Sequence, residues 1–125
     1  GGGICQAATT VYGAAIRANM TITERRNHTF KSSYVPYGED ATINYDNIDL
    51  KFRNDLKLPI YIKTNMEGKI LKCQIYGPKD DSYDKIEVKS YISHANGHTS
   101  VYSERNYYKN GKIIDKKPLP SSCYR

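Results

Sequence analysis

Helical spacing of apolar residues occurs only at the beginning of this chain of 125 residues. A turn of about 100° per residue gathers a set of apolar side chains on one face of a helix. That set is Ile4, Ala8, Val11, Tyr12 and Ala15. Asparagine is common just beyond a helix C-terminus, and Asn19 stands there. We therefore predict one helix, from about Cys5 to Ala18.

After this helix the chain reads as short strands separated by turns. Strands are predicted at 20–25, 41–45, 50–52, 59–64, 69–76, 86–93, 99–108 and 113–114. Turn sequences that join neighbouring strands into hairpins lie at 65–68, 94–98 and 109–112. The tail at 117–125 is predicted to be irregular. Residues 1–125 are thus expected to form one α+β domain, with an N-terminal helix packed on a mainly antiparallel sheet with several hairpins.

The charge balance is positive, with 19 Lys and Arg against 13 Asp and Glu and a formal net charge of +6. The basic residues are spread along the chain, which is typical of a solvated surface. Twelve tyrosines without tryptophan could stack on nucleic-acid bases, but tyrosine is also a good strand former. We expect no nucleic-acid partner. No run of 18 apolar residues occurs, so no transmembrane helix is predicted.

The chain has three cysteines, at positions 5, 73 and 123. In an oxidising compartment Cys73 and Cys123 could pair and leave Cys5 free, and the sequence leaves that pairing open. No CxxC or Cys/His spacing typical of a zinc site occurs. We therefore predict neither a metal site nor a cofactor.

Cys5 follows three glycines at the predicted helix start. The unpaired N–H groups and the dipole of a helix N-terminus stabilise a thiolate, which is the nucleophilic form of cysteine. Backbone N–H groups around Gly2, Gly3 and Gln6 could also stabilise an oxyanion. This pattern favours Cys5 as the nucleophile of an acyl transfer. The open alternative is a small buried residue beneath a tight turn.

A cysteine nucleophile needs a base, and His28 is the favoured candidate. A strand that returns beside the helix could bring His28 close to Cys5. Asp40 could orient the histidine or cap a turn. Arg25 and Arg26 could bind a substrate carboxylate, or could be surface charges. The other histidines, His94 and His98, flank a turn, where histidines are usually bystanders or at most a weak metal pair.

Several blocks of this sequence resemble the VanW domain family. These blocks are GGGICQ at 1–6, Thr9–Tyr12, Glu24–Arg25, Asn27–His28, Tyr34–Pro36, Gly38, Asp40–Thr42, Asp49–Phe52, Pro59–Ile62 and the stretch 107–119. The chain departs from the family at Ala7–Ala8, where a hydroxyl-bearing residue is common. The family also has a segment before the glycines that this chain lacks, so residues 1–125 are expected to be the C-terminal part of the full domain. The sequence does not begin with Met, so we expect a fragment or a processed chain.

The resemblance implies an extracytoplasmic protein of the bacterial cell envelope, associated with peptidoglycan and named for vancomycin-resistance clusters. Any membrane attachment would come from an anchor in the parent chain. Some VanW domains are linked to L,D-transpeptidation, in which a cysteine forms 3-3 cross-links between peptidoglycan stem peptides. The residue that this implies as nucleophile is again Cys5.

Two function hypotheses follow. The first is an L,D-transpeptidase-like cysteine acyltransferase with Cys5, His28 and Asp40 as catalytic residues, and Gly2, Gly3, Gln6, Arg25 and Arg26 around the oxyanion and substrate. The second is a non-catalytic module that binds peptidoglycan or its precursors as an accessory to glycopeptide resistance.

Overall fold

The computed structural model describes residues 2–125, which form one helix and eight strands. The elements are α1 (Gly2–Arg17), β1 (Thr21–Glu24), β2 (Lys51–Arg53), β3 (Tyr61–Glu67), β4 (Ile70–Tyr76), β5 (Lys85–Ala95), β6 (His98–Lys109), β7 (Lys112–Pro118) and β8 (Ser122–Tyr124). The predicted α+β class is confirmed.

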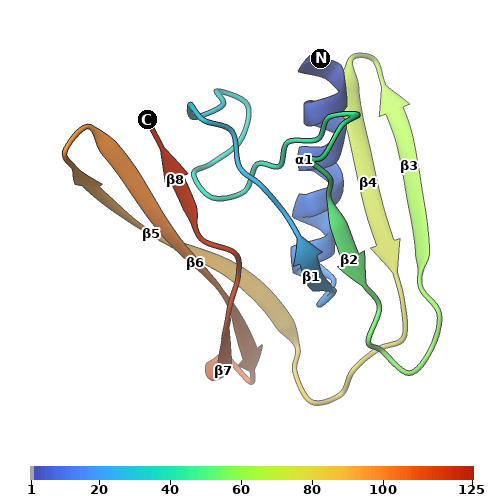
Figure 1. The fold of residues 1–125 in the computed structure, drawn as a ribbon. Helices are drawn as coiled ribbons and strands as arrows, with labels where there is room; N and C mark the ends of the chain where they lie inside the picture. Colours follow the sequence, from blue (N-terminus) through green and yellow to red (C-terminus); the bar gives the residue numbers. More distant parts are fainter. Residues whose placement is uncertain (1) are drawn as a thin grey trace.

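The described strands form three antiparallel sheets rather than one. β1 pairs with β2, and β3 pairs with β4; in the third sheet β6 lies beside β5 and pairs on its other side with both β7 and β8. Figure 1 shows α1 between the β3–β4 hairpin and this four-stranded sheet. The helix is therefore the element that joins the separate sheets.

The hairpin turns confirm the three turn predictions. Gly68 has a φ of 63° between β3 and β4. The other two hairpins each carry an Asn-Gly pair in which both residues have positive φ: Asn96 (51°) with Gly97 (76°), and Asn110 (52°) with Gly111 (77°). Asn-Gly suits such turns because both residue types tolerate left-handed φ.

The core forms on one face of α1. Buried residues of the helix pack with one residue from the loop and one from the tail: Ala8, Tyr12, Ile16, Ala41 and Leu119. The predicted apolar face is therefore largely correct, although Ile4 near the helix start is exposed. Asn19, just beyond the helix, has a left-handed φ of 64°. Arg105 of β6 ties the helix end to the sheet, because its Nη1 donates to the carbonyl oxygens of Ile16 and Met20.

Three local predictions need correction. The helix begins at Gly2, three residues earlier than expected, so Gly2 and Gly3 belong to its first turn. The segment 41–45 forms no strand, because Ala41 bonds through its backbone N–H and carbonyl to the Thr9 hydroxyl instead of to another strand. The tail is not wholly irregular: β8 pairs with β6 and buries Tyr124. Tertiary contacts determine both the loop and the tail.

No helix in residues 2–125 is long and apolar enough to cross a membrane.

Candidate functional site

The structure brings Cys5 and His28 to the same groove. Cys5 lies in α1, half-buried, and its Sγ donates a hydrogen bond to the Ile43 carbonyl oxygen at 3.7 Å. The groove encloses about 560 Å³. Its lining comprises Ile4, Cys5, His28, Ser32, Tyr34, Ile43, Asn44 and Tyr45. Cys5 and His28 are 23 residues apart in the sequence. The two side chains that the sequence predicted as nucleophile and base therefore line the same groove.

His28 is held in a fixed orientation by Asp40. The His28 Nδ1 lies 2.6 Å from Asp40 Oδ2, and the His28 backbone N–H donates to the same oxygen at 2.7 Å. Since the carboxylate accepts, Nδ1 carries the proton and Nε2 is left as the basic nitrogen. Ser32 Oγ is a second polar neighbour of His28 Nδ1, at 3.2 Å. Asp40 thus contacts His28 as predicted, and its catalytic role stays a prediction.

Asp40 is itself the centre of a buried polar network. Its side chain is 2% exposed, and its Oδ1 accepts hydrogen bonds from the Tyr124 hydroxyl and from Arg25 Nη2. Burial alone would raise the pKa of Asp40. The hydrogen bonds donated by the His28 backbone, Tyr124 and the His28 ring, together with the charge of Arg25, outweigh burial and lower this pKa below its ordinary value. Asp40 is therefore a stable anion beside the histidine.

Arg25 is part of this network and is not free for a substrate. Its guanidinium donates to the Asp40 carbonyl at 2.8 Å, to Ser122 Oγ at 2.7 Å and to the Gly38 carbonyl at 3.2 Å. Its side chain is fully buried. The expectation that Arg25 binds a substrate carboxylate is corrected, because a guanidinium enclosed by partners cannot reach a ligand. Arg26 is exposed and remains the candidate for that role.

A glycine turn places Asp40. Gly38 has a φ of 82°, and a Cβ at this position would lie 2.6 Å from Ser103 Oγ and 3.0 Å from Val101 Cγ1. Its N–H donates to the Tyr124 hydroxyl oxygen at 3.0 Å. Only glycine meets both conditions, since the left-handed region disfavours a side chain and the space is filled. The turn at Gly38 thus fixes Asp40 against β8.

The glycines before Cys5 are arranged differently from the prediction. In a helix that begins at Gly2, the N–H of Gln6 bonds to the Gly2 carbonyl, whereas the N–H groups of the first turn have no helical partner. The backbone N–H of Gln6 is therefore not free to stabilise an oxyanion. For Gly2 and Gly3 the oxyanion role stays a prediction. No heavy atom lies within 4 Å of a Cβ placed on Gly3, so packing does not require glycine there.

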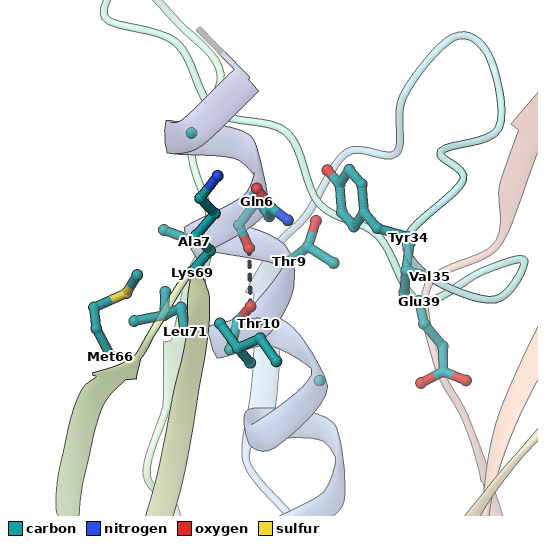
Figure 2. Close-up of a pocket in the computed structure, with 13 residues that line it drawn as sticks. Gln6, Ala7, Thr9, Thr10, Tyr34, Val35, Glu39, Met66, Lys69 and Leu71 are labelled. Atoms are coloured by element: carbon teal, nitrogen blue, oxygen red, sulfur yellow. Dashed lines mark hydrogen bonds between the residues drawn. The ribbon is translucent and has the colours of Figure 1, made fainter.

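Gly3 and Gln6 line a second groove, beside the one that holds Cys5. Figure 2 shows the Thr10 side chain next to the Gln6 carbonyl on the helix, and the Thr10 hydroxyl donates to that oxygen at 3.0 Å. Met66, Lys69 and Leu71 of the β3–β4 hairpin also line this groove. Tyr34 lines both grooves and marks their common border.

The remaining cysteines and histidines do not join the site. All three cysteines are free thiols, so Cys73 and Cys123 do not pair. Burial raises the pKa of the Cys73 thiol in β4. His94 Nδ1 lies 2.8 Å from Thr99 Oγ1 at the hairpin tip, and His98 is exposed. Within residues 2–125 no cluster of three or more His, Cys, Asp or Glu side chains could hold a metal ion.

Sequence reasoning missed Tyr124, which donates to Asp40 from the other end of the chain. It lies 84 residues away in a tail that carries no strand pattern. No local sequence signal marks it, because β8 exists only through its pairing with three residues of β6.

Comparisons with known proteins identify a family. The family model described as VanW like protein matches residues 1–76. The chain is 38% identical over 76 residues to a protein of Bacillus subtilis (strain 168) called uncharacterized protein YoaR, a match that covers 61% of this chain and 25% of the relative. It is 31% identical to the vancomycin B-type resistance protein VanW of Enterococcus faecalis (strain ATCC 700802 / V583), over 99% of this chain and 50% of the relative. The chain thus spans half the length or less of these relatives. No solved structure matches.

Proposed function

The chain belongs to the VanW family, and we propose that it carries the catalytic centre of a cysteine acyltransferase of the L,D-transpeptidase type that acts on peptidoglycan stem peptides. The observation that carries the proposal is the groove shared by Cys5 and a histidine whose Nδ1 is fixed by a buried carboxylate. A nucleophile, a base and a group that orients the base are the parts that covalent acyl transfer requires.

The reaction proceeds in two balanced steps. His28 Nε2 accepts the Cys5 thiol proton, and the thiolate attacks the carbonyl carbon that precedes a terminal D-alanine. The carbon–nitrogen bond breaks, the leaving amine takes the proton from His28, and a thioester remains. An amine of a second stem then attacks the thioester, its proton passes through His28 to the sulfur, and a new amide forms. Water in place of this amine would make the protein a carboxypeptidase.

Three features of the site support these roles. The lowered pKa of Asp40 keeps it ionised, so it stabilises an imidazolium that forms during the reaction. The N–H groups of the first helical turn, including those of Gly2 and Gly3, lie near Cys5 along the chain and suit an oxyanion. Exposed Arg26 offers a cation for a stem carboxylate.

The test is to incubate the full-length protein with muropeptides that carry a tetrapeptide stem. Intact-mass spectrometry should show an adduct equal to the donor less its terminal D-alanine, located on Cys5. Cys5→Ala should abolish the adduct, whereas Cys73→Ala, which changes another half-buried thiol on β4, should leave it unchanged. No adduct in the wild-type protein, or unchanged product with Cys5→Ala, would exclude the proposal.

A second candidate function is a non-catalytic module that binds peptidoglycan or its precursors. It is favoured by one observation: Cys5 Sγ donates to a backbone carbonyl, as a neutral thiol does. This candidate predicts that Cys5→Ala binds isolated sacculi as well as wild type does. It also predicts that iodoacetamide alkylates Cys5 no faster than a free cysteine. Faster alkylation of Cys5 would favour the enzyme.

A further inference from the structure

The outward face of the sheet around β8 carries an uncovered set of side chains. Strand alternation and the register of β5, β6 and β8 place five of them on one face: Tyr91, Ser93, Ser100, Tyr102 and Cys123. The opposite face includes Val101 and Ser122, which are buried against the body of the protein. Figure 1 shows the β5–β6 hairpin reaching past the body, with β8 alongside. Within residues 2–125 this outward face is therefore exposed.

Two tyrosine rings form a platform on this face. Tyr91 and Tyr102 are direct cross-strand partners, their ring centroids lie 6.0 Å apart, and the rings are tilted by 33°. The residues are 45% and 47% exposed. Two adjacent aromatic faces open to solvent suit a ligand that presents flat apolar surfaces, such as the C–H faces of successive sugar rings.

The platform borders a groove that no charged side chain lines. The groove encloses about 650 Å³ and is lined by Asn27, Tyr91, Ile92, Ser93, Ser100, Val101, Tyr102, Ser121, Ser122 and Cys123. None of these ten residues is a Lys, Arg, His, Asp or Glu. Hydroxyl and amide groups beside aromatic rings match the hydroxyl and N-acetyl groups of a sugar. A phosphate chain or a peptide carboxylate would require a cation, which this lining lacks.

We propose that this face binds a neutral glycan chain of β-1,4-linked N-acetylhexosamines, and that the glycan strand of the substrate lies here while its stem peptide enters the Cys5 groove. The second clause rests on the proposed function. Consecutive residues line the two grooves: Asn27 lines this one and His28 lines the one that holds Cys5. Asn27 also bonds to the Cys123 carbonyl at 2.9 Å, which fixes this border to β8.

The chain supplies a matched control for the platform. Tyr61 and Tyr76 are also direct cross-strand partners, with centroids 6.4 Å apart and rings tilted by 39°. They are 64% and 50% exposed. Neither lines any groove described for residues 2–125. Replacing Tyr61 and Tyr76 by alanine therefore removes two exposed tyrosine rings of similar geometry that lie outside the described grooves.

The experiment measures binding of a β-1,4-linked N-acetylglucosamine tetramer, a neutral glycan, using isothermal titration calorimetry on the full-length protein. The double variant Tyr91→Ala with Tyr102→Ala should lower the affinity at least about tenfold, the effect of losing a major contact. The variant Tyr61→Ala with Tyr76→Ala should bind as wild type does, and heparin, a charged polysaccharide, should not compete.

Absence of binding by the wild type, or equal losses in the two double variants, overturns the proposal. NMR of wild-type protein supplies a reading that needs no variant: the ring signals of Tyr91 and Tyr102 should shift on adding the tetramer, and those of Tyr61 and Tyr76 should not. The Cys5→Ala protein should retain glycan binding, and the platform variant should still form the Cys5 adduct with a free stem peptide. Failure of the glycan site and failure of the acyltransferase are thereby distinguished.

Discussion

The loop around Asp40 and the β3–β4 hairpin are held in opposite ways. Asp40 is buried and linked to four donors from two separate segments of the chain, the stretch after β1 and β8. In the hairpin every residue of β3 is exposed, and the Lys72–Glu67 ion pair at 2.7 Å lies at the surface. The comparison teaches that regular strand pairing builds the hairpin, whereas side-chain hydrogen bonds to one carboxylate build the site.

The largest expected difference between the two regions concerns their carboxylates. Asp40→Ala leaves the buried Arg25 without its counter-ion, and removing one partner of a buried pair costs about 3–5 kcal/mol. Glu67→Ala breaks only an exposed pair and should change the free energy of unfolding by less than about 0.5 kcal/mol. Urea unfolding of both variants checks this, and similar losses would contradict the comparison.

Glycines at positive φ provide the second contrast. Gly38→Ala meets Ser103 Oγ at 2.6 Å in addition to an unfavourable φ of 82°, and should lower stability by about 2 kcal/mol or more. Gly68→Ala in the hairpin turn has a φ of 63° but open space, and should cost about 1 kcal/mol. Thermal unfolding of the two variants gives the ranking; equal shifts would mean that the turn at Gly38 is less tightly packed than described.

Tyrosine hydroxyls give a smaller effect. Tyr124→Phe deletes a buried donor to Asp40 and an acceptor for Gly38 N–H, and should cost about 1–2 kcal/mol. It should also slow formation of the Cys5 adduct, because His28 is then less firmly oriented. Tyr76→Phe removes an exposed hydroxyl and should change neither quantity. An unaltered adduct rate in a folded Tyr124→Phe protein would show that the hydroxyl serves stability alone.

The smallest expected effect is the dependence of stability on pH in acid. The folded protein holds the pKa of Asp40 below the ordinary value of 3.8, so folding favours the ionised form. The resulting stabilisation is complete above pH 3.8 and is lost as the pH falls through the lower folded pKa. Asp40→Asn should flatten this part of the stability curve in acid denaturation, and an unchanged curve would contradict this role of Asp40.

Much of the site could be predicted from residue types and spacing. A cysteine near a helix start, one histidine in the following segment and one aspartate after a glycine are each recognisable without a structure. The environment of each residue was less accessible. Arg25 and Arg26 are neighbours of the same type, yet one is fully buried and the other exposed. Only the position of the Asp40 loop and of β8 distinguishes them.

The sequence by itself determined the helix face and the hairpins with their Asn-Gly turns, and it singled out Cys5 and His28 as candidates, because periodicity, left-handed φ and side-chain chemistry are local properties. Tertiary structure alone decided that the strands divide into three sheets, that 41–45 stays unpaired against Thr9, and that Tyr124 reaches Asp40. These outcomes depend on contacts between segments up to 84 residues apart, and such contacts are determined by the packing of the whole chain around α1.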